Sequence, residues 1–428
     1  MVDFDLTPEQ QAIRTSAKAF AAEHLTGARA IYEAAATSPE WENQFRSTLP
    51  LYRNAVQAGM IKAQVPASLG GLGGSLLDAA LVVEEFYAVE ASASLTIFGT
   101  GLGLTPLILA GSPEQQQKFL KPFLGSEGAP LASLVFSEPD GSANFVAAGA
   151  AGFGTTATLQ GAEYILNGEK IWATNCSGWD DRGADVQCVV CRILDPDDKA
   201  GDVDKARRQT AILIVTREDI AANDPAAFQV LSHPPTVGHT SVNGPHVRFS
   251  NLRVPAGNLL APAGKGAEVV EMTFTASAAL VGAMGVGIMR QAFERALEWS
   301  KAEKRGSHEV MIQKQSVADL LIKIKVRCEA ARALTWKAAL ALGKTPFGGE
   351  LAYEAKIFGS EGAVDCVMDA INLIGVSAYH QGVGLGNLLN DAVVLPIFDG
   401  GNVGVRRRQI EKIFMNPQYK PWEATFGP

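Results

Sequence analysis

The sequence lacks a surplus of basic residues. Its 428 residues include 37 Lys and Arg against 45 Asp and Glu, which gives a formal net charge of -8 at pH 7. A nucleic-acid binder neutralises phosphates with Lys and Arg, and no basic stripe interleaved with aromatic residues runs through this chain. We therefore expect no nucleic-acid partner.

Cysteine is also scarce, with five residues at positions 176, 188, 191, 328 and 366. Their odd number and scattered spacing are typical of reduced thiols in a cytosolic protein. Cys188 and Cys191 have the spacing of a redox or metal-binding pair, but their surroundings predict a strand, in which residues three apart point to opposite faces. No second Cys or His pair completes a metal site. We expect no metal, and we place both thiols in the core.

No stretch has the features of a targeting signal or an uninterrupted membrane span. The first residues, Met1–Thr7, have neither a basic start nor an apolar core. The uncharged stretches Ala91–Pro113 and Met272–Met289 approach the length of a span. Ser, Thr and Gly dilute both, and Pro106 interrupts the first. We expect two buried helices, no membrane contact and a cytoplasmic location.

The overall composition predicts a globular protein with large cores, since 47% of the residues are apolar and 19% are charged. Helical spacing dominates 1–128, and capping boxes at Thr7–Gln10 and Ser112–Gln115 start two of its helices. Short β runs follow in 129–256, and long helical periods fill 257–428. We predict an α+β chain of three domains with these bounds: an N-terminal helical domain, a middle antiparallel β-barrel or sandwich, and a C-terminal antiparallel helical bundle.

The middle domain contains an Asn167-Gly168 pair, which is a strong signal for a hairpin turn. In a strand that returns from this turn, alternation places Trp172 and Thr174 on one face. An indole and a hydroxyl side by side could bind the face and edge of a flat ring. The alternative is a core Trp beside a Thr at a strand end. The strands predicted here are 131–136, 155–160, 164–166, 186–194, 211–215 and 247–249.

A glycine-rich turn near the C-terminus carries a lone carboxylate. Asp399 follows an apolar run and precedes Gly400 and Gly401, and a helical stretch opens at Arg406. Two glycines let a flat ligand approach the backbone closely. Burial raises the pKa of a carboxylate, which suits a general base, whereas Arg406 favours its ionised form. The alternative is a helix-capping Asp with arginines on a solvated face.

The order of these stretches resembles the acyl-CoA dehydrogenase superfamily of FAD flavoproteins. A Ser137-Glu-Pro loop is followed by Gly168-x-Lys-x-Trp-x-Thr-Asn, then by Arg305 and Gln315, and finally by the Asp399 turn. The resemblance covers nearly the whole chain. It implies the three-part fold, with FAD between the β domain and the C-terminal bundle. It also implies a homotetramer in which a neighbouring subunit helps to hold the cofactor.

The resemblance assigns roles to individual residues. Ser137 matches the hydroxyl that meets the flavin ring, and Ser142 matches a pyrophosphate contact, although its loop is one residue shorter than the superfamily pattern. Trp172 matches the aromatic residue against the ring, and Thr174 matches the hydroxyl that faces flavin N5. Arg305 and Gln315 match the pair that reaches the FAD of the adjacent subunit. Gly375 matches part of a glycine pair near the dinucleotide, in which Val376 replaces the usual second glycine. Gly400 and Gly401 lie in the acidic turn itself.

Asp399 stands where acyl-CoA dehydrogenases usually carry a glutamate, and the run from Phe398 to Arg408 resembles the nitroalkane oxidase branch of the superfamily. This resemblance implies oxidation of neutral nitroalkanes to aldehydes or ketones by FAD and molecular oxygen, with release of nitrite and hydrogen peroxide. It implies that Asp399, oriented by Ser277 and kept ionised by Arg406, removes a proton, and that the carbanion adds to flavin N5. The alternative is oxidation of an acyl-CoA thioester, whose α-carbon the shorter Asp side chain would have to reach.

Overall fold

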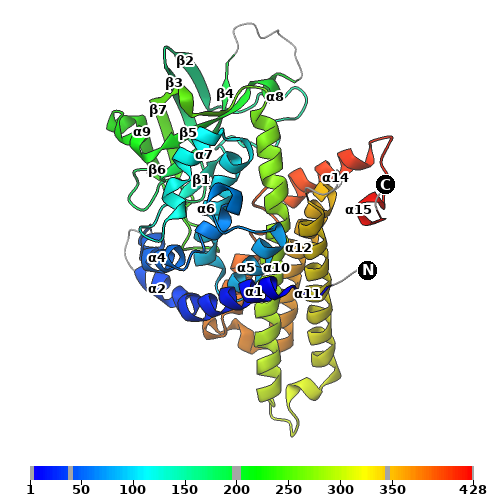
Figure 1. The fold of residues 1–428 in the computed structure, drawn as a ribbon. Coiled ribbons are helices and arrows are strands. Elements are labelled where there is room, and N and C mark those ends of the chain that lie inside the picture. The colour runs from blue at the N-terminus through cyan, green and yellow to red at the C-terminus, as the bar shows by residue number, and fades with distance from the viewer. Residues whose placement is uncertain (1–3, 37–41, 195–203, 343–347, 427–428) are drawn as a thin grey trace.

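Helices, a sheet and a second set of helices follow one another along the chain (Figure 1). The structure, a computed structural model, describes residues 4–36, 42–194, 204–342 and 348–426. The predicted α+β plan of three parts is therefore confirmed. The predicted domain boundaries at residues 128 and 256 stay predictions.

The N-terminal part packs its helices around the buried aromatic residues Phe20, Tyr52 and Phe86. Thr7 and Ser112 form the two predicted capping boxes, each with the backbone N–H and the Gln side chain three residues on. The helices of this part are α1 (Pro8–Phe20), α2 (Ala28–Ala35), α3 (Glu42–Ser47), α4 (Leu49–Gln57), α5 (Leu76–Tyr87), α6 (Ala91–Ala110) and α7 (Pro113–Phe119).

Helix α6 lies close against the sheet because two of its glycines leave room. A Cβ at Gly103 would lie 2.3 Å from the backbone nitrogen of Ser133, and a Cβ at Gly99 would lie 2.6 Å from Cγ2 of Thr174. Such distances are far below van der Waals contact, so any side chain at either position would force a shift. The helix thereby fixes the place of the loop that carries Thr174.

Within the described residues, eight strands form one sheet in the order β6-β7-β3-β2-β4-β5-β8, with β1 paired to β4. Strands β1 and β2 both run parallel to β4, whereas the other pairs are antiparallel. The sheet is therefore mixed, and the prediction of a wholly antiparallel domain is wrong in this respect. The strands are β1 (Ala132–Val135), β2 (Thr156–Gln160), β3 (Glu163–Lys170), β4 (Val186–Ile193), β5 (Thr210–Thr216), β6 (Phe228–Ser232), β7 (His246–Pro255) and β8 (Leu259–Ala261).

The predicted hairpin turn at Asn167-Gly168 is wrong. Strand β3 continues through this pair, which forms a bulge against β7. Gly168 has φ +141°, and a Cβ there would lie 2.5 Å from Cα of Thr155. The glycine therefore serves the bulge and the close approach of a neighbouring strand, and the β2–β3 hairpin turns earlier, between Gln160 and Glu163.

The same correction changes the position of Trp172. Strand β3 ends at Lys170, and Trp172 follows it with a left-handed backbone, φ +66°. The alternation argument for Trp172 and Thr174 is wrong, because neither residue lies in a strand. Cys188 and Cys191 of β4 are buried in two different core clusters, as predicted for opposite faces of a strand.

The C-terminal part is a bundle built on α10, which packs against α11, α12 and α5. Helix α10 is the long yellow-green helix that runs from the sheet to the far end of the bundle (Figure 1). The helices are α10 (Gly266–Ala302), α11 (Gln315–Ala341), α12 (Gly348–Ile374), α13 (Leu385–Ala392), α14 (Arg407–Phe414) and α15 (Glu423–Phe426).

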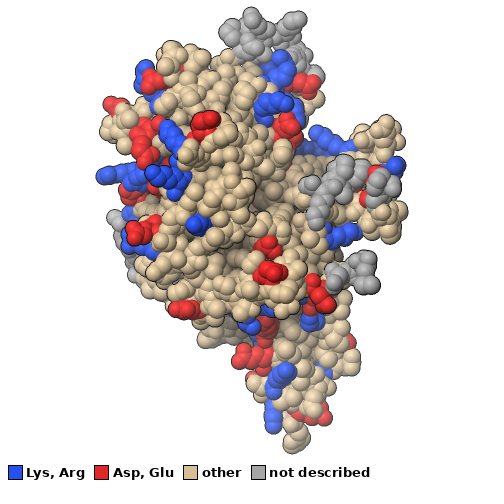
Figure 2. Space-filling model, in the orientation of Figure 1, with Lys and Arg blue, Asp and Glu red and all other residues tan. Residues whose placement is uncertain are grey.

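Three helical stretches, α6, α10 and Gly348–Tyr379, are long and apolar enough to cross a membrane by length and composition alone. Between 50% and 67% of each apolar window is buried inside the molecule. On the face shown in Figure 2, basic and acidic side chains are interspersed over the β domain. The absence of membrane and nucleic-acid partners stays a prediction.

A buried ion pair joins the loop after β1 to the end of β3. Nζ of Lys170 lies 2.9 Å from Oε1 of Glu138, with side-chain exposures of 0% and 6%. The ammonium also donates to the carbonyl of Phe136, and the carboxylate accepts from the backbone of Gly154 and Thr155. Burial raises the pKa of Glu138, but Lys170 and the hydrogen bonds from Thr155 outweigh it and lower that pKa. The pair therefore holds Ser137 and Trp172 in adjacent segments.

Replacing Lys170 by Met should lower the free energy of unfolding by about 3–5 kcal/mol, because Glu138 then stays buried without its counter-charge. Chemical denaturation followed by circular dichroism measures this loss. As a control, Lys265→Met removes an exposed lysine paired with Glu268, and we expect a change within about 0.5 kcal/mol. Equal losses in the two variants would contradict the structural role of the buried pair.

Candidate active site

A cavity of about 1190 Å³ lies where the N-terminal helices, the sheet loops and the bundle meet. Helices α5 and α6 form one side, α10 forms another, and the turn after residue 395 closes a third. Nine of the twelve predicted site residues line this cavity: Ser137, Ser142, Trp172, Thr174, Ser277, Asp399, Gly400, Gly401 and Arg406.

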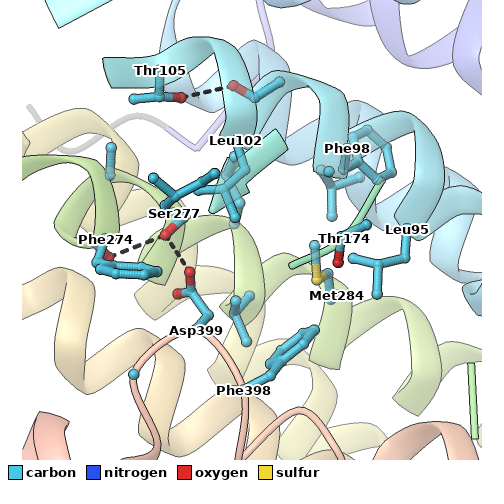
Figure 3. A pocket seen from close by; sticks show the side chains of 18 of the residues that line it. Leu95, Phe98, Leu102, Thr105, Thr174, Phe274, Ser277, Met284, Phe398 and Asp399 are labelled. Carbon is cyan, nitrogen blue, oxygen red and sulfur yellow. Dashed lines mark hydrogen bonds between the residues drawn. The ribbon is translucent and has the colours of Figure 1, made fainter. Parts of the chain in front are cut away.

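The carboxylate of Asp399 projects into the cavity and makes two side-chain contacts. Ser277 Oγ, from α10, donates to Oδ1 at 2.6 Å (Figure 3), and Arg406 Nη2 lies 3.2 Å from Oδ2. The Asp399 side chain is 6% exposed. Its backbone is left-handed, φ +51°, and Gly400 continues in the same region with φ +70°. The carboxylate thus faces the cavity and does not cap a helix.

Arg406 contacts several groups besides the Asp399 carboxylate. Its side chain is fully enclosed, and Nη2 donates to the carbonyls of Asp399 at 2.6 Å and Phe274 at 2.8 Å. Its guanidinium also lies 5.1 Å from the ring centroid of Tyr353. A helical turn over Asn402–Arg406 leads into α14, so the predicted helical stretch begins slightly earlier than expected.

Burial raises the pKa of Asp399, and Arg406, Lys356 and the Ser277 hydrogen bond oppose that rise. Asp399 can therefore hold a proton more readily than an exposed aspartate while its neighbours keep it ionised. Lys356 was missed by the sequence-based prediction. Burial lowers its pKa to about 8, which Asp399 counteracts.

Apolar side chains line the cavity beside the carboxylate. Leu95, Phe98 and Leu102 of α6 face Met284 of α10 and Phe398 of the acidic turn (Figure 3). These residues form an apolar wall next to the Asp399 carboxylate, which suits a small substrate with an alkyl chain.

The residues predicted to meet the flavin line the same cavity. Ser137 follows β1, and its carbonyl accepts from the backbone of Ile171 at 3.0 Å, which joins its loop to the Trp172 segment. Trp172 is 53% exposed, so its indole is available to a ligand. Thr174 is held through its carbonyl, which accepts from Ser133 Oγ at 2.7 Å.

Three predicted residues lie outside the cavity. Arg305, in the connection after α10, donates to the carbonyl of Ile374 at 2.7 Å and to Ser377 Oγ at 2.8 Å. Gly375 lies between those two acceptors, so Arg305 and Gly375 are neighbours at the end of the bundle. Gln315 bonds Asp319 on its own helix. Among the described residues, no three His, Cys, Asp or Glu side chains gather to hold a metal.

Comparisons with known proteins identify the family. Residues 7–127 match the model of the acyl-CoA dehydrogenase N-terminal domain, and residues 264–415 match that of the acyl-CoA dehydrogenase C-terminal domain. The nitroalkane oxidase of Podospora anserina is 50% identical over 100% of this chain and 99% of that protein. The chain belongs to the nitroalkane oxidase family within the acyl-CoA dehydrogenase superfamily.

Solved structures agree with this assignment. The structure of a Podospora anserina nitroalkane oxidase matches with a TM-score of 0.96 and 50% identity, covering 100% of both chains. An active-site aspartate-to-asparagine variant of a nitroalkane oxidase, crystallised with 1-nitrooctane, matches with a TM-score of 0.95 and 45% identity, again over 100% of both chains. As a family member, the chain is a flavoprotein oxidoreductase that oxidises nitroalkanes.

The raised pKa of Asp399 predicts an acid limb in the pH profile of kcat/KM for a neutral nitroalkane, above the ordinary pKa of about 3.9. Ser277→Ala should move this limb to higher pH, because the lost hydrogen bond had favoured the carboxylate. Steady-state kinetics across the acid range measure the shift.

Thr105→Val is the matched control, since the Thr105 hydroxyl lines the same cavity but donates to the carbonyl of Gly101 (Figure 3). Its acid limb should stay in place. An unchanged limb in Ser277→Ala would show that Ser277 does not act on the ionisation of Asp399.

Proposed function

We propose that this enzyme oxidises neutral alkyl nitro compounds with FAD as cofactor and oxygen as electron acceptor, and that Asp399 removes the proton next to the nitro group. The observation that supports this most is the buried Asp399 carboxylate, held by Ser277 and Arg406 at an apolar wall. Overall, a nitroalkane, oxygen and water give an aldehyde or ketone, nitrous acid and hydrogen peroxide, which balances in atoms and electrons.

The cavity residues fit a flavin. The half-exposed indole of Trp172 could lie against a flat ring, while Ser137, Thr174 and Ser142 add hydroxyls to the same lining. When bound, FAD would accept the electron pair of the substrate and pass it to oxygen. Gly400 and Gly401 add no side chain that would obstruct the ring.

The side chains near Asp399 suit its carboxylate to remove a proton from carbon. Its raised pKa makes it a stronger base than an exposed aspartate, and Arg406 keeps that base ionised before the substrate arrives. Ser277 fixes Oδ1, which leaves the carboxylate one orientation toward the cavity. Proton removal leaves a nitronate whose negative charge rests on the nitro oxygens. Its carbon would then pass an electron pair to the flavin, nitrite would leave as the C–N bond breaks, and water would supply the carbonyl oxygen.

The apolar wall indicates the kind of substrate. Leu95, Phe98, Leu102 and Met284 offer contact to an alkyl chain but no charged group. Burial of each methylene contributes about 0.8 kcal/mol, so we propose linear nitroalkanes of medium length, the class to which the 1-nitrooctane of the related structure belongs.

We further propose a cytoplasmic homotetramer. The five cysteines are free and buried, which suits a reducing compartment. Arg305 and Gln315 lie outside the cavity of their own chain, so contact with a flavin would require the cavity of a neighbouring subunit.

In this arrangement Arg305→Ala should lower the flavin content per chain after dilution. The control Lys304→Ala, at the adjacent exposed residue, should keep it. Absorbance spectra measure the flavin content, and light scattering measures the size of the assembly. Equal flavin retention in the two variants would count against a cofactor role for Arg305.

Asp399→Asn tests the proton transfer directly. On neutral nitroethane, kcat/KM should fall by at least about 100-fold, since general-base catalysis commonly contributes that much. On ethyl nitronate prepared in base beforehand, the variant should keep most of its rate, because the proton is already gone. Nitrite and peroxide assays under air measure both reactions.

The exposed control Asp365→Asn, on α12 and outside the cavity, should match the parent on both substrates. Full activity of Asp399→Asn on neutral nitroethane would refute the assigned base. Bleaching of the flavin by an acyl-CoA without air, with no nitrite formed from nitroethane, would instead favour the thioester reaction.

A further inference from the structure

Lys356 of α12 is a buried cation next to the acidic turn, and the steps described above give it no part. Its side chain is fully enclosed. Nζ donates to Oδ1 of Asn402 at 3.0 Å and to the carbonyl of Leu395 at 3.3 Å. Leu395 precedes the Asp399 turn and Asn402 follows it. One ammonium group therefore joins the two ends of the turn.

Asn402 is bound by the same helical turn of α12. Its Nδ2 donates to Ser360 Oγ at 3.0 Å and to Glu361 Oε1 at 3.1 Å, and its side chain is buried. Ser360 Oγ in turn donates to the carbonyl of Lys356 at 2.6 Å. Three side chains of α12, those of Lys356, Ser360 and Glu361, thus hold the far end of the turn through Asn402.

The turn needs such an anchor because its backbone is unfavourable. Asp399 and Gly400 occupy the left-handed region in succession, with φ of +51° and +70°. A non-glycine residue there is held by its surroundings and not by its own preference. A base that must reach a carbon-bound proton loses rate steeply when it moves, by about 100-fold for a shift of about 1 Å.

The charge of Lys356 acts in the same direction as its hydrogen bonds. The charged groups that act on it are Asp399, Arg406 and Glu361, of which Glu361 is also paired with Arg407 at 2.8 Å. Burial lowers the pKa of Lys356 to about 8. Below that pH its cation adds to that of Arg406 and favours the ionised form of Asp399.

We propose that Lys356 is a positioning residue for the proton transfer: its ammonium joins Leu395 to Asn402 and thereby holds the Asp399 carboxylate at the reacting carbon. This inference rests on the proposed function, because positioning of this kind matters for a reaction in which Asp399 takes the proton. It also assigns Asn402, through the same contacts, to the support of the turn.

The experiment compares Lys356→Met and Asn402→Ala with the parent holoenzyme on neutral nitroethane and on ethyl nitronate. Both variants should lose about ten- to hundredfold in kcat/KM on the neutral substrate and much less on the nitronate, because the nitronate needs no base. In Lys356→Met the acid limb should also move to higher pH, since a cation that favoured the carboxylate is gone. In Asn402→Ala, which keeps that cation, the limb should move less.

Flavin content and melting temperature are measured in parallel, and Lys323→Met, which removes a lysine paired with Asp369 of α12 outside the cavity, serves as the matched control with unchanged kinetics. Equal losses on both substrates, or no loss on either, would overturn the positioning role. If Lys356→Met does not fold, Asn402→Ala decides by the same comparison. A parent enzyme that forms no nitrite from either substrate would refute the proposed function instead.

Discussion

The central constraint in this structure is that a carboxylate must stay ionised in a place that opposes its charge. Asp399 is enclosed, and burial alone would favour its neutral form. Arg406 and the Ser277 hydroxyl compensate, and each comes from a different element: a helical turn before α14 and the middle of α10. The meeting of these elements therefore has an electrostatic reason as well as an apolar one.

The segments that follow β1 and β3 line the same cavity, and a buried ion pair joins them. Glu138 and Lys170 are both out of water, so neither tolerates the loss of its partner. Their pairing brings the loop of Ser137 next to the segment of Trp172. Trp172 follows the end of β3 and has a left-handed backbone. Local backbone preferences alone would not keep these two segments together.

Much of the fold followed from patterns that act locally. Capping boxes at Thr7 and Ser112 and the long apolar periods of α10 to α12 identified helices well, because capping and amphipathic spacing are properties of short stretches. The Asn167-Gly168 pair misled, since a bulge and a hairpin turn both exploit the permissive backbone of glycine. The parallel pairing of β1 with β4 depends on a return of the chain that no local pattern encodes.

The candidate site also contains residues that could be predicted from the sequence and one that could not. Residues with a recognisable order along the chain, such as Ser137, Thr174 and Asp399, could be named from the resemblance, and the structure brings them to one cavity. Lys356 could not, because a lone lysine in a helical stretch is ordinarily an exposed residue. Its burial follows from the acceptors that Leu395 and Asn402 supply from a distant part of the sequence.

The length of helix α10 keeps the proton-transfer site near Ser277 apart from the Arg305 connection. With 37 residues it spans about 55 Å, at 1.5 Å a residue, and the 25 residues from Ser277 to its last residue, Ala302, cover about 38 Å, so Ser277 and the Arg305 connection cannot serve the same cavity within one chain. Ser277, Lys356, Asp399 and Arg406, by contrast, all belong to a single chain and to one end of the bundle. Contacts at the far end can therefore vary, through drift or redesign of the assembly, without altering the groups that handle the proton.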